Sequence, residues 1–314
     1  MTILVTGAAG FIGSHLTRRL LKEGAHIIGV DSFTDFYPRW IKERNLAPVR
    51  SDRNFEFLAR DLLDLDLEEI LGRVNIVYHL AAQAGVRSSW GKSFSVYIKD
   101  NIQTTQRLLE AAKGKPLHRL VYASSSSVYG LTPTLPMSET SLLYPLSPYG
   151  VTKLAAEQLC FLYCKNYGIP TVSLRFFTVY GPGQRPDMAF HRFFQAIAEG
   201  RPISVFGDGE QTRDFTSVDD IVEAALAAGR LGRPGEVYNV GGGHRERLND
   251  LFPILEEICQ RKVNIVREEK QKGDVAHTLA DIQKARRDLG YEPRKGLRDG
   301  LREEWEWIRA LYQV

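Results

Sequence analysis

Two side chains in the middle of the chain have a spacing that suits proton transfer. Tyr149 and Lys153 are four residues apart in SPYGVTK, so on a helix they share one face. A phenol has a pKa of about 10, too high for a base at neutral pH, but a neighbouring ammonium stabilises the phenolate. Tyr149 could then take a proton from a substrate hydroxyl. The alternative is an ordinary helix that exposes one tyrosine and one lysine.

A run of four serines lies in ASSSSVYG, residues 123–130, directly after an apolar segment. Such a run could be a polar loop at the end of a strand. However, no acid stands among these hydroxyls. Hydroxyls donate hydrogen bonds to a substrate carboxylate, which an ionised acid would repel. The run therefore bears on which substrates a site here would accept.

Glycines near the N-terminus predict a dinucleotide site. In ILVTGAAGFIGSHL, Gly7, Gly10 and Gly13 follow a strand and open a helix. They let the backbone approach a pyrophosphate, for which the helix N-terminus supplies N–H donors. Asp31 ends the next strand, where an acid accepts hydrogen bonds from an adenosine ribose and repels a 2′-phosphate. The pattern favours NAD over NADP; a purely structural glycine turn is the alternative.

The elements that must position these residues alternate along the first half of the chain. Short β-rich runs separated by amphipathic segments predict an α/β fold with a doubly wound, parallel Rossmann sheet. Ser147 and Pro148 have the form of an N-cap and first-turn proline for the helix that bears Tyr149, which should end at Gly168. We expect strands at 3–6, 26–30, 55–59, 76–80, 120–123 and 171–176.

Beyond residue 176 the alternation gives way to loops rich in Gly, Pro and Arg, such as YGPGQRPDM. We therefore expect an NAD-binding domain over 1–176 and a smaller C-terminal α/β lobe that binds substrate over 177–314. One further strand, at 236–241, should return to the sheet of the first domain. The two parts would then be interleaved in sequence.

Composition excludes several classes of function. The 314 residues have a net charge of +3, with Lys and Arg scattered among acids, so we expect neither nucleic acid nor a membrane as partner. No apolar stretch approaches the roughly 18 residues of a membrane span, and the N-terminus is unlike a signal peptide, which predicts a cytoplasmic protein. Cys160, Cys164 and Cys259 lack CxxC spacing, so we expect no metal site, disulfide or thiol chemistry.

The form TGAAGFIG resembles the extended short-chain dehydrogenase/reductases, the NAD-dependent epimerase/dehydratase family. The likeness continues through RDLLD and HLAA to Asn101, although NIQTT stands where the family writes NxxGT. It implies that Tyr149 and Lys153 are catalytic and that Ser125 binds the reacting hydroxyl. It also implies cofactor contacts from Gly7, Gly10, Phe11, Ile12, Gly13, Asp31, Ser32, Asp61, Leu62, Leu80, Ala81, Ala82, Asn101, Ser124, Tyr149 and Lys153.

The second half resembles the nucleotide-sugar branch of this family. RFFTVYGPGQRPDM, FGDG, TRDFTSVDD and KGDVAHTLADI come one after another as in UDP-sugar 4-epimerases. The resemblance implies that Arg213 binds the diphosphate and that the segment around Val205 holds the uracil. Gln271 stands where UDP-glucose 4-epimerases usually have an arginine. For Arg213, Arg185 and Arg87, an idle loop arginine is the alternative.

Neighbouring acids would decide the fate of the sugar once a hydride has left its C4. Family dehydratases carry Asp-Glu before VYG and UDP-glucuronate decarboxylases carry Glu, whereas this chain has Ser126 and Ser127. With Thr178 and Gln271, these positions resemble UDP-glucuronate 4-epimerases. We expect conversion of UDP-glucuronate to UDP-galacturonate, with NAD as the hydride shuttle. The substrate-binding residues implied are Ser125, Ser126, Ser127, Thr178, Arg185, Val205, Arg213, Gln271, Asp274 and Arg87.

Other functions stay open at this point. The motifs also fit a UDP-glucose or UDP-N-acetylglucosamine 4-epimerase, a UDP-glucuronate decarboxylase, a nucleotide-sugar 4,6-dehydratase or a non-catalytic subunit on the same fold. Such subunits often lose the catalytic tyrosine or lysine, which this chain keeps. Leu154, Phe161 and Leu162 have few obvious solvent positions, so we expect a homodimer; coverage by their own domain is the alternative.

Overall fold

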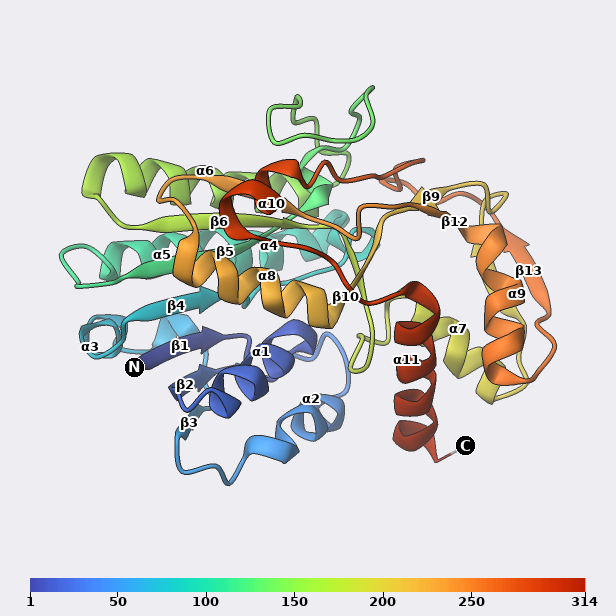
Figure 1. Cartoon of the computed structure of the whole chain (residues 1–314), viewed down its shortest axis with the longest axis horizontal. Coiled ribbons are helices and arrows are strands. Elements are labelled where there is room, and N and C mark those ends of the chain that lie inside the picture. Colours follow the sequence, from blue (N-terminus) through green and yellow to red (C-terminus); the bar gives the residue numbers. More distant parts are fainter. Residues whose placement is uncertain (314) are drawn as a thin grey trace.

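A parallel β-sheet forms the centre of the computed structural model, which describes residues 1–313 (Figure 1). Within those residues the sheet has seven strands in the order β11-β6-β5-β4-β1-β2-β3. All neighbours run parallel, which confirms the predicted doubly wound α/β fold. The strands are β1 (Thr2–Thr6), β2 (His26–Val30), β3 (Phe55–Leu58), β4 (Ile76–His79), β5 (Arg119–Ser125), β6 (Thr171–Phe176) and β11 (Val237–Val240).

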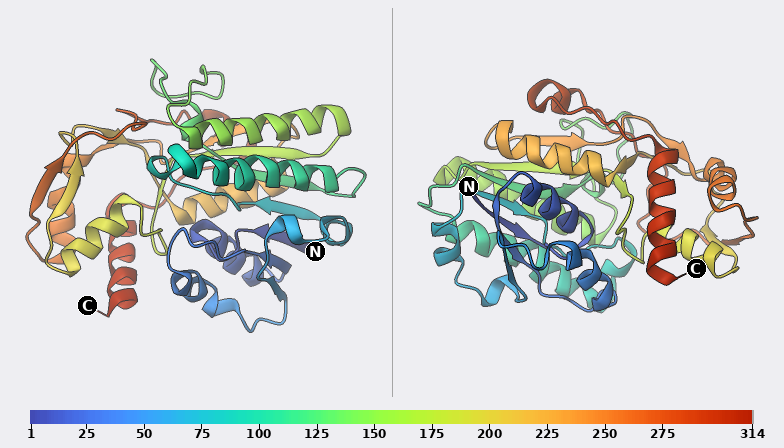
Figure 2. Two further views of the ribbon diagram at one scale, coloured as in Figure 1. Left: turned by 180° about the vertical axis from the view of Figure 1, so that it is seen from behind. Right: turned by 60° about the horizontal axis from the view of Figure 1, so that its bottom comes forward.

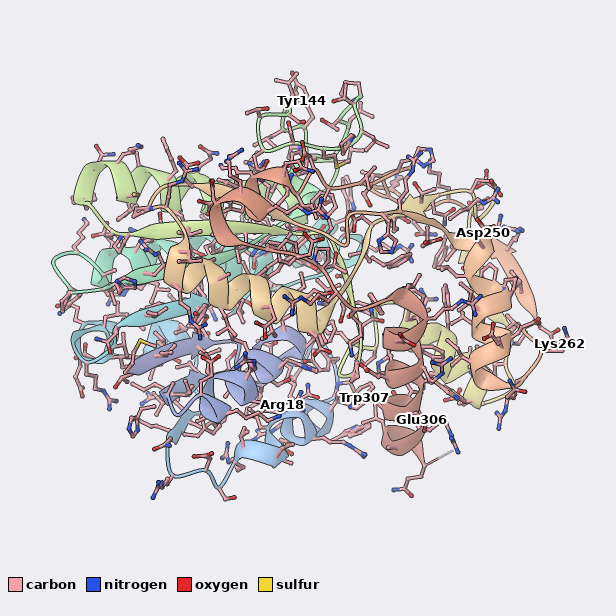
Figure 3. The ribbon with its side chains drawn as sticks, in the orientation of Figure 1. Arg18, Tyr144, Asp250, Lys262, Glu306 and Trp307 are labelled. Atoms are coloured by element: carbon pink, nitrogen blue, oxygen red, sulfur yellow. The ribbon has the colours of Figure 1, made fainter. Side chains whose placement is uncertain are left out.

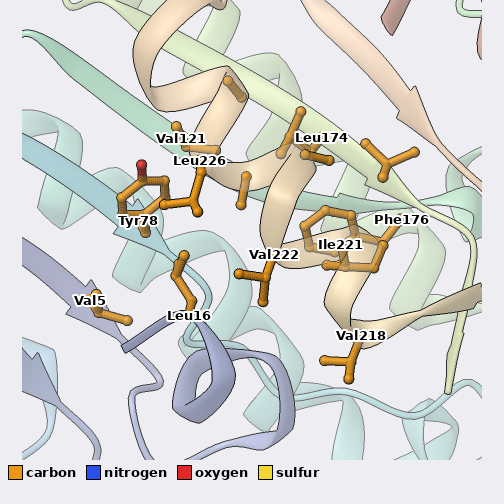
Figure 4. Close-up of a cluster of buried hydrophobic side chains, with 14 of the residues drawn as sticks. Val5, Leu16, Tyr78, Val121, Leu174, Phe176, Val218, Ile221, Val222 and Leu226 are labelled. Atoms are coloured by element: carbon orange, nitrogen blue, oxygen red, sulfur yellow. The ribbon is translucent and has the colours of Figure 1, made fainter. Parts of the chain in front are cut away.

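Helices cover both faces of the sheet (Figure 2). One face packs on α1 (Phe11–Lys22), α8 (Val218–Leu231) and α10 (Gln283–Leu289), and the other on α3 (Leu67–Gly72), α5 (Thr104–Ala111) and α6 (Pro148–Tyr167). Successive strand residues point to opposite faces, so strands covered on both sides are mostly apolar, although β6 also buries Ser173 and Arg175. Figure 4 shows the α8 side, where Ile221, Val222 and Leu226 lie against the sheet together with Val5, Val121 and Leu174.

The smaller lobe lies beside the carboxyl ends of the strands (Figure 1). Its core contains Phe190, Phe194, Leu251, Leu255 and Trp305. In the part of the chain that the structure describes, three two-stranded sheets belong to this lobe: β7 (Thr178–Tyr180) with β10 (Phe215–Ser217), β8 (Ile203–Phe206) with β13 (Ile265–Glu268), and β9 (Thr212–Arg213) with β12 (Glu246–Arg247). The helices are α7 (Ala189–Ala198), α9 (Leu248–Cys259) and α11 (Leu297–Tyr312).

The chain passes between the two parts more than once. The strand expected at 236–241 is β11, which pairs with β6. Helices α8 and α10 also lie on the large sheet, although both come after residue 176. The division into an NAD-binding domain over 1–176 and a substrate-binding lobe over 177–314 stays a prediction. A loop that carries the exposed Tyr144 projects away from both parts (Figure 3).

The remaining elements lie in the connections between these strands and helices. They are α2 (Arg39–Leu46), α4 (Phe94–Tyr97), the π-helix Ile98–Gln103 that joins α4 to α5, and the 3₁₀ turns 47–49, 62–64, 87–89, 91–93 and 126–128. None of the helices formed by residues 1–313 has the length and apolar character to cross a membrane.

Candidate functional site

The glycine loop between β1 and α1 has a backbone that only small residues allow. Gly7 has φ +71°, and a Cβ at Gly13 would lie 2.0 Å from the carbonyl oxygen of Gly7. Gly10 is the N-cap of α1 and offers no side chain to its free N–H groups, and the first helical turn contains no acid. These N–H groups are available to an anion at the positive end of the helix dipole. The loop therefore fits a pyrophosphate.

Asp31 lies at the carboxyl end of β2, beside this loop. Its carboxylate accepts hydrogen bonds from the backbone N–H groups of Ala9, at 3.1 Å, and Phe33, at 2.9 Å. Burial raises the pKa of Asp31, while Lys42, whose Nζ is 3.9 Å from Oδ1, acts in the opposite direction. Both side chains line the same cavity. The position suits an adenosine ribose, as the sequence predicts, and Lys42 adds a charge that the sequence pattern did not reveal.

A cavity of about 210 Å³ continues from Asp31 past the glycine loop to Tyr149. Of the predicted cofactor contacts, Gly7, Gly10, Phe11, Ile12, Gly13, Asp31, Ser32, Asp61, Leu62, Leu80, Ala81, Ala82, Tyr149 and Lys153 line it.

Two predicted cofactor contacts, Asn101 and Ser124, lie outside this lining. Asn101 is buried: its Oδ1 accepts from the N–H of Gln83 and its Nδ2 donates to Thr152 Oγ1, so it fixes the loop after β4. The Ser124 hydroxyl donates to Glu157.

The geometry of the glycine loop and the lining of the first cavity together fit a dinucleotide.

The proposed acid–base pair comes from the first turns of α6. Ser147 caps this helix by accepting a hydrogen bond from Gly150 N, which confirms the predicted start. Tyr149 and Lys153 then point to the same cavity. Burial raises the pKa of Tyr149, and a hydrogen bond with Ser125 acts against that rise. The structure thus brings together the three residues predicted to be catalytic.

Lys153 is buried with its ammonium close to an aromatic ring. Its side chain is 3% exposed, and Nζ lies 4.4 Å from the ring centroid of Tyr122. Burial lowers its pKa to about 7. A protonated Lys153 would lower the cost of ionising Tyr149, because opposite charges stabilise each other strongly in a buried site. The pair is therefore equipped to move a proton near neutral pH.

A second, larger cavity of about 970 Å³ opens from Tyr149 into the smaller lobe. It shares part of its wall with the first cavity: Phe11, Ile12, Phe36, Ala84, Tyr149 and Arg185 line both. Tyr149 therefore lies where the two cavities meet. The predicted substrate residues that line the second cavity are Ser125, Ser126, Ser127, Thr178, Arg185, Val205, Arg213, Asp274 and Arg87.

Gln271 is the predicted substrate residue that the lining of this cavity does not include. It is half-buried, and its amide donates to the carbonyl of Glu269. Ser125 Oγ accepts a hydrogen bond from Ser127 N, which bends the serine run into the 3₁₀ turn 126–128. Ser126 and Ser127 thereby face the cavity beside Tyr149.

Arginines in the lining of the larger cavity bring positive charge to it. Arg87 pairs with Asp274 at 2.8 Å, and Arg213 donates to the backbone carbonyl of Ala276. Arg192, on α7, lies over the ring of Phe206 with Cζ 5.3 Å from its centroid, and Arg87 lies 4.1 Å from the same centroid. Fixed guanidinium groups of this kind suit a diphosphate. Sequence reasoning missed Arg192, which carries no motif signal on its helix.

Arg185 lies at the junction of the two cavities. It makes a two-point ion pair with Asp187, both contacts being 3.0 Å long. Its side chain is 21% exposed. An arginine held in this way presents its remaining N–H groups to a ligand without free rotation.

Comparison with known proteins agrees with this geometry. Residues 3–241 match the model of the NAD dependent epimerase/dehydratase family. A Bacillus subtilis (strain 168) protein named "Uncharacterized UDP-glucose epimerase YtcB" is 47% identical, over 100% of this chain and 99% of its own. A UDP-glucuronate 4-epimerase of Thermodesulfobacterium geofontis (strain OPF15) is 41% identical, over 99% and 97%.

A solved structure is similar over almost the whole chain. UDP-glucuronic acid 4-epimerase of Bacillus cereus, in complex with UDP-glucuronic acid and NAD, is 46% identical with a TM-score of 0.97. The comparison covers 99% of this chain and 100% of that one. The overall fold thus agrees with the family match, and the chain belongs to the NAD-dependent epimerase/dehydratase family.

Proposed function

We propose that this chain is an NAD-dependent epimerase that interconverts UDP-glucuronate and UDP-galacturonate. The observation that carries the proposal is the acid-free serine run, which lines the larger cavity beside Tyr149 and Arg185. The Bacillus cereus structure, which binds UDP-glucuronic acid and NAD, supports it.

The residues of the chain divide the work between proton transfer and recognition. Tyr149 Oη takes the proton from the sugar 4-hydroxyl and later returns it. Ser125 shares a hydrogen bond with that oxygen and orients it, and Lys153 supplies the positive charge. NAD, when bound, supplies a hydride acceptor and donor in the neighbouring cavity.

Recognition of the sugar's carboxylate falls to neutral donors and one arginine. Ser126, Ser127 and Thr178 provide hydroxyls, and Arg185 provides a guanidinium, all from the lining of one cavity. A decarboxylase or dehydratase needs an acid before VYG according to the family pattern, and this chain has none there. The proposed product is therefore an epimer, and the carboxylate stays on the sugar.

The proposal is tested by incubating the purified protein with UDP-glucuronate, without added NAD, and separating the products by chromatography. UDP-galacturonate as the main product is expected, and a UDP-pentose would instead show a decarboxylase. The matched control is Tyr149→Phe, which removes one oxygen. It should keep UDP and NAD binding while turnover falls by about 10²-fold to 10⁴-fold.

UDP-glucose 4-epimerisation is the second candidate, because the Bacillus subtilis relative that is 47% identical is named an uncharacterized UDP-glucose epimerase. The same assay with UDP-glucose separates the two. Efficient formation of UDP-galactose, with the uronic acid ignored, would favour this candidate.

We also propose that the protein is a cytoplasmic homodimer. Phe161 and Leu162, on α6, are 45% and 50% exposed, and Val96 and Ile98 beside it are each 43% exposed. Helices α4 and α6 contact each other, so these side chains lie on neighbouring elements. A second copy packed on them would bury an apolar area that monomers seldom leave in water.

A further inference from the structure

A buried ion pair lies beneath the serine run, outside the linings of both cavities. Glu157, on α6, and Arg175, on β6, have side chains that are 1% and 3% exposed. Arg175 Nη2 donates to Glu157 Oε1 at 2.6 Å, and Nε donates to Oε2 at 3.0 Å. Arg175 is the direct neighbour of Ser124 across the strand pair β5–β6. The pair is therefore built into the sheet at the point where the serine run begins.

This pair is hydrogen-bonded to the first serine of the run and to Tyr129, two residues beyond its last serine. Ser124 Oγ donates to Glu157 Oε2 at 2.6 Å. At the other end, Arg175 Nη1 donates to the hydroxyl of Tyr129 at 2.9 Å. Tyr129 in turn donates to Asn239 on β11 at 2.6 Å. The 3₁₀ turn 126–128 thus lies between Ser124 and Tyr129, and both of these residues are hydrogen-bonded to the same ion pair.

Glu157 also continues the face of α6 that carries the catalytic residues. Tyr149, Lys153 and Glu157 succeed one another at intervals of four residues, about one helical turn. The same helix face therefore presents the base and its ammonium to the cavities and, one turn further on, the carboxylate that holds the serine run.

We propose that Glu157 and Arg175 are positioning residues that fix the serine run against Tyr149, a role that rests on the function proposed above. Stability alone gives little reason for such a pair, because replacing both partners of a buried ion pair by apolar residues is often neutral or stabilising. Hydroxyls that must meet a reacting oxygen need a fixed geometry, since a displacement of about 1 Å can cost about 10²-fold in rate.

The test separates positioning from stability with two double variants. Glu157→Leu/Arg175→Met removes the pair. Ser124→Ala/Tyr129→Phe keeps the pair and cuts its hydrogen bonds to the run. Tm, NAD content, UDP affinity, KM and kcat are measured for each. We expect kcat to fall by about 10²-fold in the first variant and about tenfold in the second, with KM and UDP affinity within about twofold of the unaltered chain.

A control removes a more exposed ion pair, which joins α10 to the residue before β11. Lys284 pairs with Glu236 beside β11, at 2.7 Å, away from the serine run. Glu236→Leu/Lys284→Met should leave kcat unchanged. The positioning role is wrong if the folded Glu157→Leu/Arg175→Met variant keeps its kcat. Should that variant not fold, an unchanged kcat in Ser124→Ala/Tyr129→Phe overturns the role and a lowered kcat upholds it.

Failure of the proposed function would look different. The unaltered chain is assayed first with UDP-glucuronate and with UDP-glucose. If UDP-glucuronate is not converted, the proposed function is wrong, and the variants are then compared on the UDP-sugar that the chain does turn over. The positioning role is judged only from the ratios between variants.

Discussion

At the scale of single residues, Ser127 offers a direct test of carboxylate recognition. Its hydroxyl lines the larger cavity together with Arg185 and Thr178. Ser127→Glu would place a carboxylate beside that of the bound uronic acid. Like charges brought together in a site that excludes water cost several kcal/mol. We expect the dissociation constant of UDP-glucuronate to rise at least about tenfold more than that of UDP-glucose. Calorimetric titration measures both constants.

The control for this variant is Ser127→Gln, which has a similar size and no charge. It should weaken binding of the two UDP-sugars to the same extent. Equal losses for both sugars with Ser127→Glu as well would show that the serine run does not read the carboxylate.

Lys153 is expected to destabilise the fold while it serves the reaction. Its pKa falls from 10.5 to about 7 on folding because of burial, so between these values the unfolded chain holds a proton that the folded chain lacks. This penalty is complete below about pH 7 and disappears as the pH rises to about 10.5. Lys153→Met should therefore raise Tm most below pH 7 and least above pH 10, while turnover is lost.

Thermal unfolding of both proteins at several pH values checks this expectation. The corresponding change at Lys262, which is 91% exposed, supplies the baseline for replacing a lysine by methionine. A gain in Tm that is the same at all pH values would mean that the buried ammonium is not its source.

Sequence reasoning found the residues that belong to motifs and missed those defined by their neighbours. Tyr149, Lys153 and Ser125 are predicted by spacing and resemblance, and the structure brings them together. Lys42 is on α2 and lines the first cavity, and Arg192 is on α7 and lines the larger one. Each residue reaches its cavity only because its helix packs beside that cavity. No local pattern distinguishes such residues from ordinary surface charges, since the partner that gives them a role is distant in sequence.

At the scale of elements, apolar runs and caps were sufficient to predict most of the large sheet. The expected strands match β1 to β6 within one or two residues, and Gly168 ends α6 with φ +69°. The clearest difference is β5, expected at 120–123, which continues to Ser125. Polar residues there stay in the strand because the pairing with β6 extends to Phe176.

The glycine loop makes a prediction at this scale. A Cβ at Gly13 would lie 2.0 Å from the carbonyl oxygen of Gly7, and the nearest obstacles are backbone atoms that cannot move aside. Gly13→Ala should therefore displace the loop from the start of α1, so that NAD content falls by at least about tenfold and Tm falls as well. Absorbance after denaturation and thermal unfolding measure the two effects.

Gly24→Ala is the comparison variant. A Cβ at Gly24 would have no neighbour within 4 Å, although its φ of +80° also disfavours a side chain. It should cost stability and leave NAD content unchanged. A Gly13→Ala protein with full NAD content would show that the loop tolerates the extra methyl group.

At the scale of the whole molecule, the exposed apolar side chains of α6 predict the state of assembly. Leu162→Glu would place a charge in the proposed contact between two copies, where burial of an unpaired charge is costly. We expect the protein to elute as a monomer from a sizing column calibrated by light scattering, with its circular dichroism unchanged. Leu231→Glu, at another exposed leucine (58%) on α8, should leave the assembly intact. A dimer that survives Leu162→Glu must use another surface.

The sequence predicts the overall architecture better than it predicts where each helix packs. Short-range patterns indicate that the sheet exists, that its strands are parallel and that β11 returns to it, but they do not give the order of the strands. The placement of α8 and α10 on the sheet could not be predicted in this way, because the apolar face of an amphipathic helix does not indicate which surface the helix will cover. The same holds for the ion pair of Glu157 and Arg175, which joins segments 18 residues apart.

Tyr149, Lys153 and Glu157 are spaced four residues apart along α6, so the regular geometry of the helix sets the distances between them. One residue inserted after Gly150 would turn everything beyond it by about 100°. Tyr149 would stay in place, while Lys153 and Glu157 would swing away from the cavity and from Ser124. Over this stretch, natural variation should replace side chains freely on the outer face of the helix and never change its length.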